Sequence, residues 1–283
     1  MNIFSTVASS KPSRIGVVIA ASAVAMVALA GCATTPVVAT ESSQTPVDSS
    51  KPTIVMVHGA WSDASPFDAV SDELRADGYA VVNFANPLRA LGSDTEYLAS
   101  FLETRTDGPV VLVGHSYGGA LISGAALSDP DVTALVYVNG FVPEEGETIL
   151  ELSSKAGPVD ADALFDMAPF PGDHNTDLYL KPGAFAGGFV NGLPEELAAP
   201  LFAKQRPITY AALSEPARAD QARKTLPSWY VAGTDDHSIA FETQTWMAQR
   251  AGSTLTTITA GHLSMAADPE TVARVIIEAA TTN

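Results

Sequence analysis

Ser116 stands between two glycines in the stretch GHSYG, residues 114–118, after the apolar run VVLV and before a stretch of helical character. A serine on a sharp turn from a strand into a helix holds its hydroxyl clear of its own backbone. The N-terminus of the following helix favours negative charge that develops beside it. The pattern therefore predicts a nucleophilic serine; the alternative is a plain strand–helix turn that contains a serine.

A serine hydroxyl is a weak nucleophile and needs a base, for which a histidine is the usual choice. Of the five histidines, His115 would point away from its neighbour Ser116, His58 lies at a strand end and His174 in an irregular segment. His237 and His262 remain. His262 follows the last expected strand and precedes the last expected helix, which places it at the same sheet edge as the serine.

The base needs a carboxylate that orients its ring and stabilises the imidazolium. The stretch VAGTDDH follows the preceding expected strand and offers two adjacent candidates, Asp235 and Asp236. Serine, aspartate, histidine is one of the chain orders in which a catalytic triad occurs. Spacing alone leaves the choice between the two aspartates open.

An acyl-transfer site also needs two backbone N–H groups that bind the oxyanion of the tetrahedral intermediate. One is expected from the residue after the nucleophile, Tyr117. The other is expected from the loop HGAW that follows the first strand, where Ala60 is the candidate. A plain glycine turn is the alternative for this loop.

The elements that must position these residues alternate between strands and helices. Expected strands cover 53–58, 80–85, 109–114, 132–140, 228–233 and 253–259, and expected helices cover 66–77, 93–105, 117–127, 240–250 and 269–280. Ser93 with Glu96 three residues later is typical of a capping box at the start of the second helix. Short continuous Val/Ile runs separated by helices predict a parallel sheet that is covered on both faces.

Residues 141–207 interrupt this alternation, because they are rich in Pro, Gly and Phe and contain one expected helix, 194–205. So long an excursion is rarely a mere loop. We predict a lid inserted into the sheet. Apolar side chains that could line a pocket beneath it, or equally belong to the core, are Trp61, Phe141, Phe170, Phe185 and Phe189.

The overall composition is that of a globular protein, with 283 residues of which 46% are apolar. The formal net charge is −17. Because Lys11 and Arg14 lie in the N-terminal leader, the remainder carries 13 basic and 32 acidic residues, about −19. A field of that sign repels phosphate backbones and anionic lipid, so we expect no nucleic-acid partner.

The leader itself is typical of export. Lys11 and Arg14 precede sixteen mostly apolar residues, Ile15 to Ala30. This run is shorter than the roughly 20 residues of a membrane span and fits the core of a signal peptide.

The leader ends in LAGC, which resembles the lipobox of bacterial lipoproteins, with Cys32 as the lipidated mature N-terminus. We therefore predict a signal peptide at 1–31, a flexible tether rich in Thr, Ser and Pro at 32–51, and a catalytic domain at 52–283. The expected location is the bacterial cell envelope, with a membrane anchor at Cys32. The alternative is an ordinary secretory leader with a chance cysteine.

Taken together, these motifs resemble the α/β-hydrolase superfamily, and more narrowly the small-lid esterases that include plant methylesterases, hydroxynitrile lyases and bacterial homologues. The resemblance covers about 52–283 and rests on VMVHGAW, NPLR, VLVGHSYGG, VYVNGFVPEEGE, GTDDHSI and GH. It implies an α/β-hydrolase fold, with a mostly parallel central sheet, helices on both faces and an inserted lid.

The family pattern Gly-x-x-Asp falls on Asp236 after Gly233, which favours Asp236 over Asp235 as the acid and leaves Asp235 the role of turn capping. The family's oxyanion donors fall on Ala60 and Tyr117. One departure concerns the lyases of this group, which carry a lysine directly after the catalytic histidine. This chain has Leu263 there, which favours ester hydrolysis over cyanohydrin cleavage.

We therefore predict a serine hydrolase, with Ser116, His262 and Asp236 as the triad, that cleaves carboxylic esters of small to medium, neutral, apolar character. No cofactor is expected, and no metal, because no His/Asp/Glu cluster has the spacing of metal ligands. The expected partner is a small-molecule ester. The alternatives are a hydrolase-like lyase, a cofactor-free perhydrolase, a receptor that binds in the same pocket, and a surface adhesion or scaffold protein without a triad.

Overall fold

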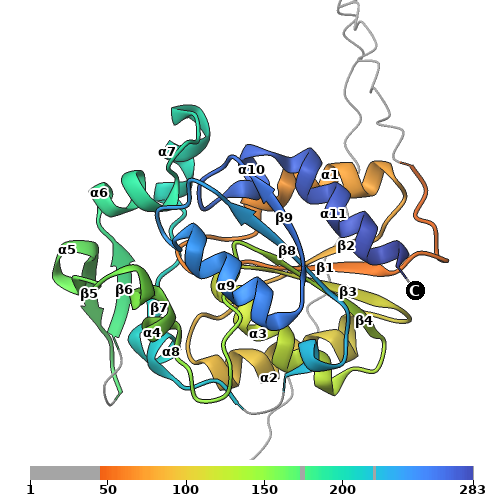
Figure 1. Ribbon diagram of the computed structural model, residues 1–283, viewed down its shortest axis with the longest axis horizontal. Helices are drawn as coiled ribbons and strands as arrows, with labels where there is room; N and C mark the ends of the chain where they lie inside the picture. The colour runs from red at the N-terminus through yellow and green to blue at the C-terminus, as the bar shows by residue number, and fades with distance from the viewer. Residues whose placement is uncertain (1–44, 173–175, 219–220, 283) are drawn as a thin grey trace, which may run out of the picture. The chain divides into compact units, whose positions relative to one another are not determined.

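The structure, a computed structural model, describes residues 45–172, 176–218 and 221–282. Its centre is a six-stranded sheet in the order β2-β1-β3-β4-β8-β9, in which every neighbouring pair is parallel (Figure 1). The strands are β1 (Thr53–Val57), β2 (Val81–Phe84), β3 (Val110–His115), β4 (Val132–Val138), β8 (Ser228–Gly233) and β9 (Thr254–Ile258). The predicted parallel sheet is confirmed.

The central strands are apolar on both faces because helices cover both faces. Every residue of β3 and β8 is buried, as is every residue of β1 after Thr53. Figure 1 shows α1 and α11 on one side of the sheet and α2 and α3 on the other. The helices that accompany this sheet are η1 (Ser65–Phe67), α1 (Asp68–Ala76), α2 (Leu91–Arg105), α3 (Tyr117–Ala125), η2 (Ala126–Ser128), α9 (Phe241–Ala251), α10 (Ser264–Ala267) and α11 (Pro269–Thr281).

Helix α11 shows how the sequence forms these covering helices. The Asp268 carboxylate accepts a hydrogen bond from the Thr271 N–H, and Pro269 occupies the first turn, where it has no backbone donor to lose. Val272, Val275, Ile276 and Ala279 follow the spacing of one helix face and are buried. The last predicted helix is therefore confirmed within one residue.

Helix α2 begins two residues earlier than predicted, and the predicted capping box at Ser93 and Glu96 is wrong. Ala90 is the N-cap and makes no side-chain capping bond. The Gly92 N–H instead donates to the Glu215 carboxylate at 3.1 Å, which comes from a distant part of the chain. The first turn of α2 is therefore capped by the distant Glu215 side chain, not by a residue next to it in the sequence.

The segment between β4 and β8, residues 139–227, is called the inserted segment below. Its described part contains a second, antiparallel sheet in the order β5-β6-β7. Its elements are α4 (Ile149–Ser153), η3 (Ser154–Ala156), α5 (Ala161–Leu164), β5 (Phe165–Pro169), β6 (Thr176–Leu180), α6 (Pro182–Ala184), η4 (Phe185–Phe189), α7 (Glu195–Ala203), β7 (Ile208–Thr209), α8 (Tyr210–Ser214) and η5 (Ala222–Lys224). Helix α7 matches the predicted helix at 194–205, whereas the second sheet is not foreseen by the sequence pattern. The role of 141–207 as a lid stays a prediction.

The predicted signal peptide at 1–31, Cys32 and most of the predicted tether lie outside the described residues. Of the tether's last residues, Asp48 donates its N–H to the Gly78 carbonyl, and the Lys51 ammonium donates to the Asp77 carbonyl. Across the described ranges, none of the helices combines the length and the apolar character needed to cross a membrane.

Candidate active site

The parallel register brings the carboxyl ends of all six strands to one edge of the sheet. Val57 is paired with Gly114, His115 with Val138, and Gly233 with Ile258. The residues that follow these ends are the loop 58–61, Ser116, Asn139, the pair Asp235 and Asp236, and the loop that carries His262. Most of the predicted site residues therefore gather at this edge, as an open parallel sheet favours for ligand sites.

Ser116 occupies the single position between β3 and α3, with φ 51° and ψ −122°, in a region that non-glycine residues rarely adopt. Its carbonyl accepts from the N–H groups of Gly119 and Phe141, which fixes the turn. Two glycines make room for it. A Cβ on Gly59 would come within 2.6 Å of the Ser116 Cβ, and a Cβ on Gly118 would collide with the Val57 carbonyl oxygen.

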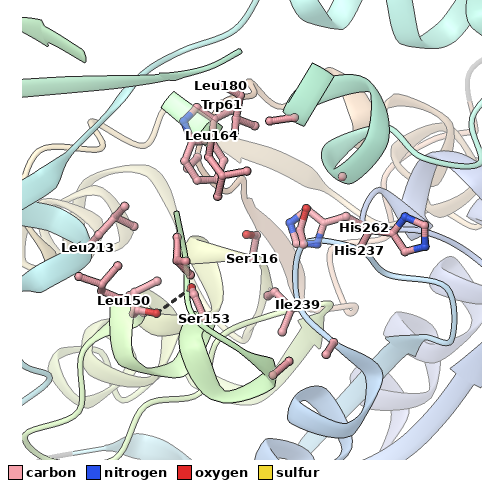
Figure 2. A pocket seen from close by; sticks show the side chains of 18 of the residues that line it. Trp61, Ser116, Leu150, Ser153, Leu164, Leu180, Leu213, His237, Ile239 and His262 are labelled. Carbon is pink, nitrogen blue, oxygen red and sulfur yellow. Dashed lines mark hydrogen bonds between the residues drawn. The ribbon is translucent and has the colours of Figure 1, made fainter. Parts of the chain in front are cut away.

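His262 and Asp236 form a buried pair. The His262 Nδ1–H donates to Asp236 Oδ2 at 2.9 Å, and both side chains are almost completely inaccessible to solvent. Figure 2 shows His262 and Ser116 facing the same cavity. The structure thus brings the predicted serine, base and acid together around one pocket.

The Asp236 carboxylate is surrounded by donors. Burial raises the pKa of a carboxyl group, but the charge of a protonated His262 and the hydrogen bonds to the carboxylate outweigh burial, so the pKa of Asp236 lies below its ordinary value. Asp236 is therefore an anion over the pH range in which a histidine acts as a base. The donors are the side chains of His262, Asn139 and Gln244 and the backbone N–H groups of Ser238 and Ile239.

Asp235 has a different environment. Its side chain is 63% exposed and lies 3.3 Å from the His237 ring, whose side chain is 56% exposed. Its backbone is tied down, since its carbonyl accepts from the Asn191 side chain at 2.7 Å and its N–H donates to the Ala260 carbonyl. The geometry therefore assigns the histidine contact to Asp236 and a surface pair to Asp235 and His237.

Two other histidines lie close to the site and are neutral. Burial, followed by the proximity of His262, holds the pKa of His115 well below its ordinary value; its ring centroid lies 4.7 Å from that of His262. Burial lowers the pKa of His58 to about 4. His58 Nδ1 bonds with the Gly59 carbonyl, and its Nε2 accepts the Asn86 N–H at 3.1 Å, which requires a neutral ring with its proton on Nδ1.

The two predicted oxyanion donors, Ala60 and Tyr117, both line the cavity beside Ser116. The loop of Ala60 is held from the inserted segment, because the Trp61 N–H donates to the Arg206 carbonyl at 2.9 Å. The Tyr117 side chain points elsewhere and donates its hydroxyl to the buried Asp94 carboxylate at 3.0 Å. This bond holds the first turn of α3, which begins directly after Ser116.

The cavity has a volume of about 670 Å³ and a mainly apolar lining (Figure 2). Its apolar wall includes Trp61, Phe141, Ile149, Leu150, Val159, Leu164, Phe165, Leu180, Leu213 and Ile239. The described lining residues include two acids, Asp160 and Asp236, and no lysine or arginine.

The expected pocket aromatics are only partly confirmed. Trp61 and Phe141 line the cavity, whereas Phe170, Phe185 and Phe189 do not. Phe185 and Phe189 form a layer behind the wall: their rings lie 5.1 Å apart, and Phe189 packs edge-on against Trp61 at 6.2 Å. Phe170 lies instead over the Arg89 guanidinium. The presence of aromatic residues in the sequence did not show which of them line the cavity and which pack behind the lining residues.

Three residues of the site were not found by sequence reasoning. Phe165 stacks on Trp61 at 5.6 Å and lines the cavity, but it belongs to the unforeseen second sheet. Asn139 directly follows β4, and a polar residue at the carboxyl end of a buried strand was the signal that could have found it. Gln244 lies on α9 and is fully buried, which the helix pattern did not indicate.

Within 45–172, 176–218 and 221–282, no cluster of three or more His, Cys, Asp or Glu side chains is arranged to hold a metal ion.

This strand order, serine turn and buried histidine–aspartate pair coincide with a family match: the chain belongs to the alpha/beta hydrolase family, whose sequence model matches residues 54–275. Among curated proteins, the chain is 32% identical over 123 residues to the carbendazim hydrolyzing esterase of Nocardioides sp. (strain SG-4G), covering 39% of this chain and 51% of that protein. The match thus spans about half of that relative's length. It is 28% identical over 218 residues to Methylesterase 8 of Arabidopsis thaliana, covering 68% of this chain and 75% of that protein.

Among solved structures, polyneuridine aldehyde esterase aligns with a TM-score of 0.70 and 20% identity, covering 81% of this chain and 98% of that one. At this identity the similarity establishes the shared fold. The predicted α/β-hydrolase fold and the resemblance to an esterase group of that family are therefore confirmed.

Proposed function

We propose that this protein is a serine esterase that cleaves carboxylic esters through an acyl-enzyme intermediate. The observation that carries the proposal is the buried His262–Asp236 hydrogen bond at 2.9 Å beside a serine in a strained turn, all around one cavity. Backbone strain and a buried charged pair cost stability, so their coincidence at a pocket favours a catalytic role. The names of both curated relatives, an esterase and a methylesterase, support the same reaction class.

In the proposed reaction, the Ser116 hydroxyl attacks the ester carbonyl carbon while the free ring nitrogen of His262, Nε2, takes its proton. The same nitrogen then gives that proton to the departing alcohol as the ester C–O bond breaks. A water molecule repeats the sequence on the acyl-enzyme and releases the acid. Asp236 keeps Nδ1 protonated throughout and stabilises the imidazolium that forms in each half-reaction.

The backbone N–H groups of Ala60 and Tyr117 are the proposed oxyanion donors. Donors that are fixed before the reaction stabilise the developing charge without a further cost of reorganisation. The Trp61–Arg206 backbone bond and the neutral His58 hold the loop of Ala60 in place. The bond from the Tyr117 hydroxyl to Asp94 holds the start of α3 in place.

The cavity supports neutral, apolar substrates of small to medium size. Its volume of about 670 Å³ lies within the range of small-molecule sites. A substrate carboxylate or phosphate would meet Asp160 at the wall and find no described lysine or arginine there. An aliphatic or aromatic acyl or alcohol group would instead bury apolar area against Trp61 and its neighbours.

The test is a series of p-nitrophenyl esters of increasing acyl length, measured on the unaltered protein, on Ser116→Ala and on Ser153→Ala. Ser153 lines the same cavity but donates its hydroxyl to the Ile149 carbonyl, so it serves as a matched control. We expect Ser116→Ala to lose several powers of ten in kcat, and Ser153→Ala to stay within a few-fold. Substantial hydrolysis by Ser116→Ala would overturn the proposal. Slow turnover with tight ligand retention in the unaltered protein would point to a receptor.

We also propose that Cys32 carries a lipid anchor in the bacterial cell envelope, supported by the sequence LAGC alone. Cys32→Ser should abolish labelling by radioactive palmitate, because it removes the thiol to which the lipid would be attached. Stable membrane attachment needs more than one acyl chain. A chain that starts at Thr45 should keep its kcat, since it retains the Asp48 and Lys51 contacts to the domain. Unlabelled, soluble unaltered protein would contradict the anchor.

A further inference from the structure

The hydrogen bonds around the Asp236 carboxylate are distributed unevenly between its two oxygens. Oδ1 accepts two backbone N–H groups, from Ser238 at 2.8 Å and Ile239 at 2.9 Å. Oδ2 accepts three side-chain donors, each at 2.9 Å: His262 Nδ1, Asn139 Nδ2 and Gln244 Nε2. A carboxylate offers about four lone-pair directions, so the two amides compete directly with the histidine for one oxygen.

The surroundings fix both amides as donors at Oδ2. Gln244 Nε2 also donates to the Ile239 carbonyl at 2.8 Å, so a reversed amide would place its oxygen against a carbonyl and a carboxylate. The Asn139 oxygen accepts the Ser264 hydroxyl, which leaves its NH₂ group toward Asp236. Asn139 also lies at φ 44°, a conformation that asparagine tolerates better than most residues. Both side chains are fully buried.

We propose that Asn139 and Gln244 are positioning residues that set the strength of His262 as a base by sharing Asp236 Oδ2 with it. The inference rests on the proposed function, since it concerns the base of that reaction. Each competing donor withdraws charge from the oxygen that accepts the hydrogen bond of His262 Nδ1–H. Removing one donor makes that oxygen a stronger acceptor, which stabilises the imidazolium and makes His262 more basic. The two amides thereby limit how strongly Asp236 stabilises the protonated form of His262.

The other titratable groups that face the pair do not titrate in the relevant range or are shared by all variants. His115, on β3, is held neutral because burial places its pKa well below its ordinary value. Tyr230, on β8, is neutral because burial, followed by the charge of Asp236, raises its pKa well above its ordinary value. Asp235 and His237 are exposed on the same loop as Asp236 and are present in every variant of the experiment.

The experiment is the pH dependence of kcat/KM for p-nitrophenyl acetate in Gln244→Met, in Asn139→Gly and in the control Thr243→Val. Methionine matches glutamine in size without donating, and glycine tolerates the positive φ at position 139. Thr243 is the buried neighbour of Gln244 on α9 and makes no contact with Asp236 among the described hydrogen bonds. Circular dichroism establishes that each variant is folded.

We expect the acid limb of the profile to move to higher pH by about 0.5 to 1 unit in Gln244→Met and in Asn139→Gly, and to stay in place in Thr243→Val. The low-field proton resonance of His262 Nδ1 should move further downfield in the two variants, because its bond to Oδ2 strengthens. A uniform loss of activity with an unmoved limb would mean a structural role only and would overturn the inference. A limb that moves to lower pH would also overturn it. Hydrolysis that persists in Ser116→Ala would instead remove the proposed function on which it rests.

Discussion

At the carboxyl-end edge of the six-stranded sheet, Ser116, Asp236 and His262 are each less than one-tenth exposed. In the inserted segment, α7 has no buried residue, and its Leu197 and Phe202 are 48% and 41% exposed. Both regions border the same space, but the edge is fixed by buried parallel strands and the segment by a small three-stranded sheet. We therefore propose that the edge carries the reaction and that the inserted segment, which supplies most of the cavity wall, selects the substrate.

The largest expected effect is a difference in kcat between substitutions of the two adjacent aspartates at this edge. Asp236→Asn should lower kcat by about 10⁴-fold, because the amide no longer holds the His262 tautomer that accepts the serine proton. Asp235→Asn should change kcat no more than a few-fold, since Asp235 pairs at the surface with His237. Steady-state kinetics with one p-nitrophenyl ester measures both. The opposite ranking would place the acid at Asp235.

The next effect compares one glycine from each region. Gly118→Ala should lower the free energy of unfolding by about 3 kcal/mol, because its Cβ would collide with the Val57 carbonyl, which is rigid backbone. Gly183→Ala, in α6 of the inserted segment, should change it by less than about 0.5 kcal/mol, since no atom lies within 4 Å of the new Cβ. Urea unfolding measures both. Equal losses would mean that the two regions are packed alike.

A smaller effect depends on pH and concerns His58, in the loop that carries the proposed oxyanion donor Ala60. The pKa of His58 falls from 6.5 to about 4 on burial, so the unfolded chain binds a proton between these pH values that the folded chain does not. Stability should therefore fall as pH drops through this window, with His58 contributing up to about 3 kcal/mol.

In His58→Asn the dependence of unfolding free energy on pH between 6.5 and 4 should be shallower than in the unaltered protein. Urea unfolding at three pH values within the window measures this slope. His237→Asn, at an exposed position, is the control. An unchanged slope in His58→Asn would show that the ring titrates normally in the folded protein.

The smallest effect concerns the attachment of the inserted segment. Arg89 donates to the Asp177 carboxylate on β6 at 2.6 Å and to the Pro207 carbonyl at 3.4 Å. Because the guanidinium is partly exposed, Arg89→Ala should cost at most about 1 kcal/mol, raise KM up to about five-fold and leave kcat nearly unchanged. Arg75→Ala, which breaks an exposed pair on α1, should change neither constant. A fall in kcat for Arg89→Ala would show that the segment also positions the reacting groups.

The same two regions differ in how far the sequence predicts them. The strands of the central sheet were predicted within a residue or two, because residues such as Val110–Val113 are apolar without interruption and both sheet faces are covered. The second sheet was not predicted, since β5 exposes four of its five residues and β7 has two residues, which leaves no hydrophobic period to detect. The start of α2 was predicted wrongly for a related reason. The carboxylate that accepts from its first turn belongs to Glu215, which lies 123 positions from Gly92 in the chain.

The site shows the same division. Ser116, His262 and the pair of aspartates could be named as candidates from the sequence, because the proposed chemistry requires those residue types at strand ends, and the structure brings Ser116, His262 and Asp236 to one cavity. The preference for Asp236 over Asp235 came from family resemblance, and the contact itself depends on which side chain faces inward in a loop. Asn139 and Gln244 were not predicted, because a single buried amide produces no hydrophobic periodicity in the sequence. Their contact with the candidate site becomes apparent only in the structure, where both donate to Asp236 Oδ2.

The most direct test of the account is active-site labelling of the purified protein with a fluorophosphonate, followed by identification of the modified peptide by mass spectrometry. We expect one label per chain, on Ser116, because this serine lines the cavity together with the hydrogen-bonded His262–Asp236 pair. Labelling should disappear in Ser116→Ala and slow by several powers of ten in His262→Ala. A label on another serine of the cavity, such as Ser153, or undiminished labelling of His262→Ala, would contradict the proposed triad.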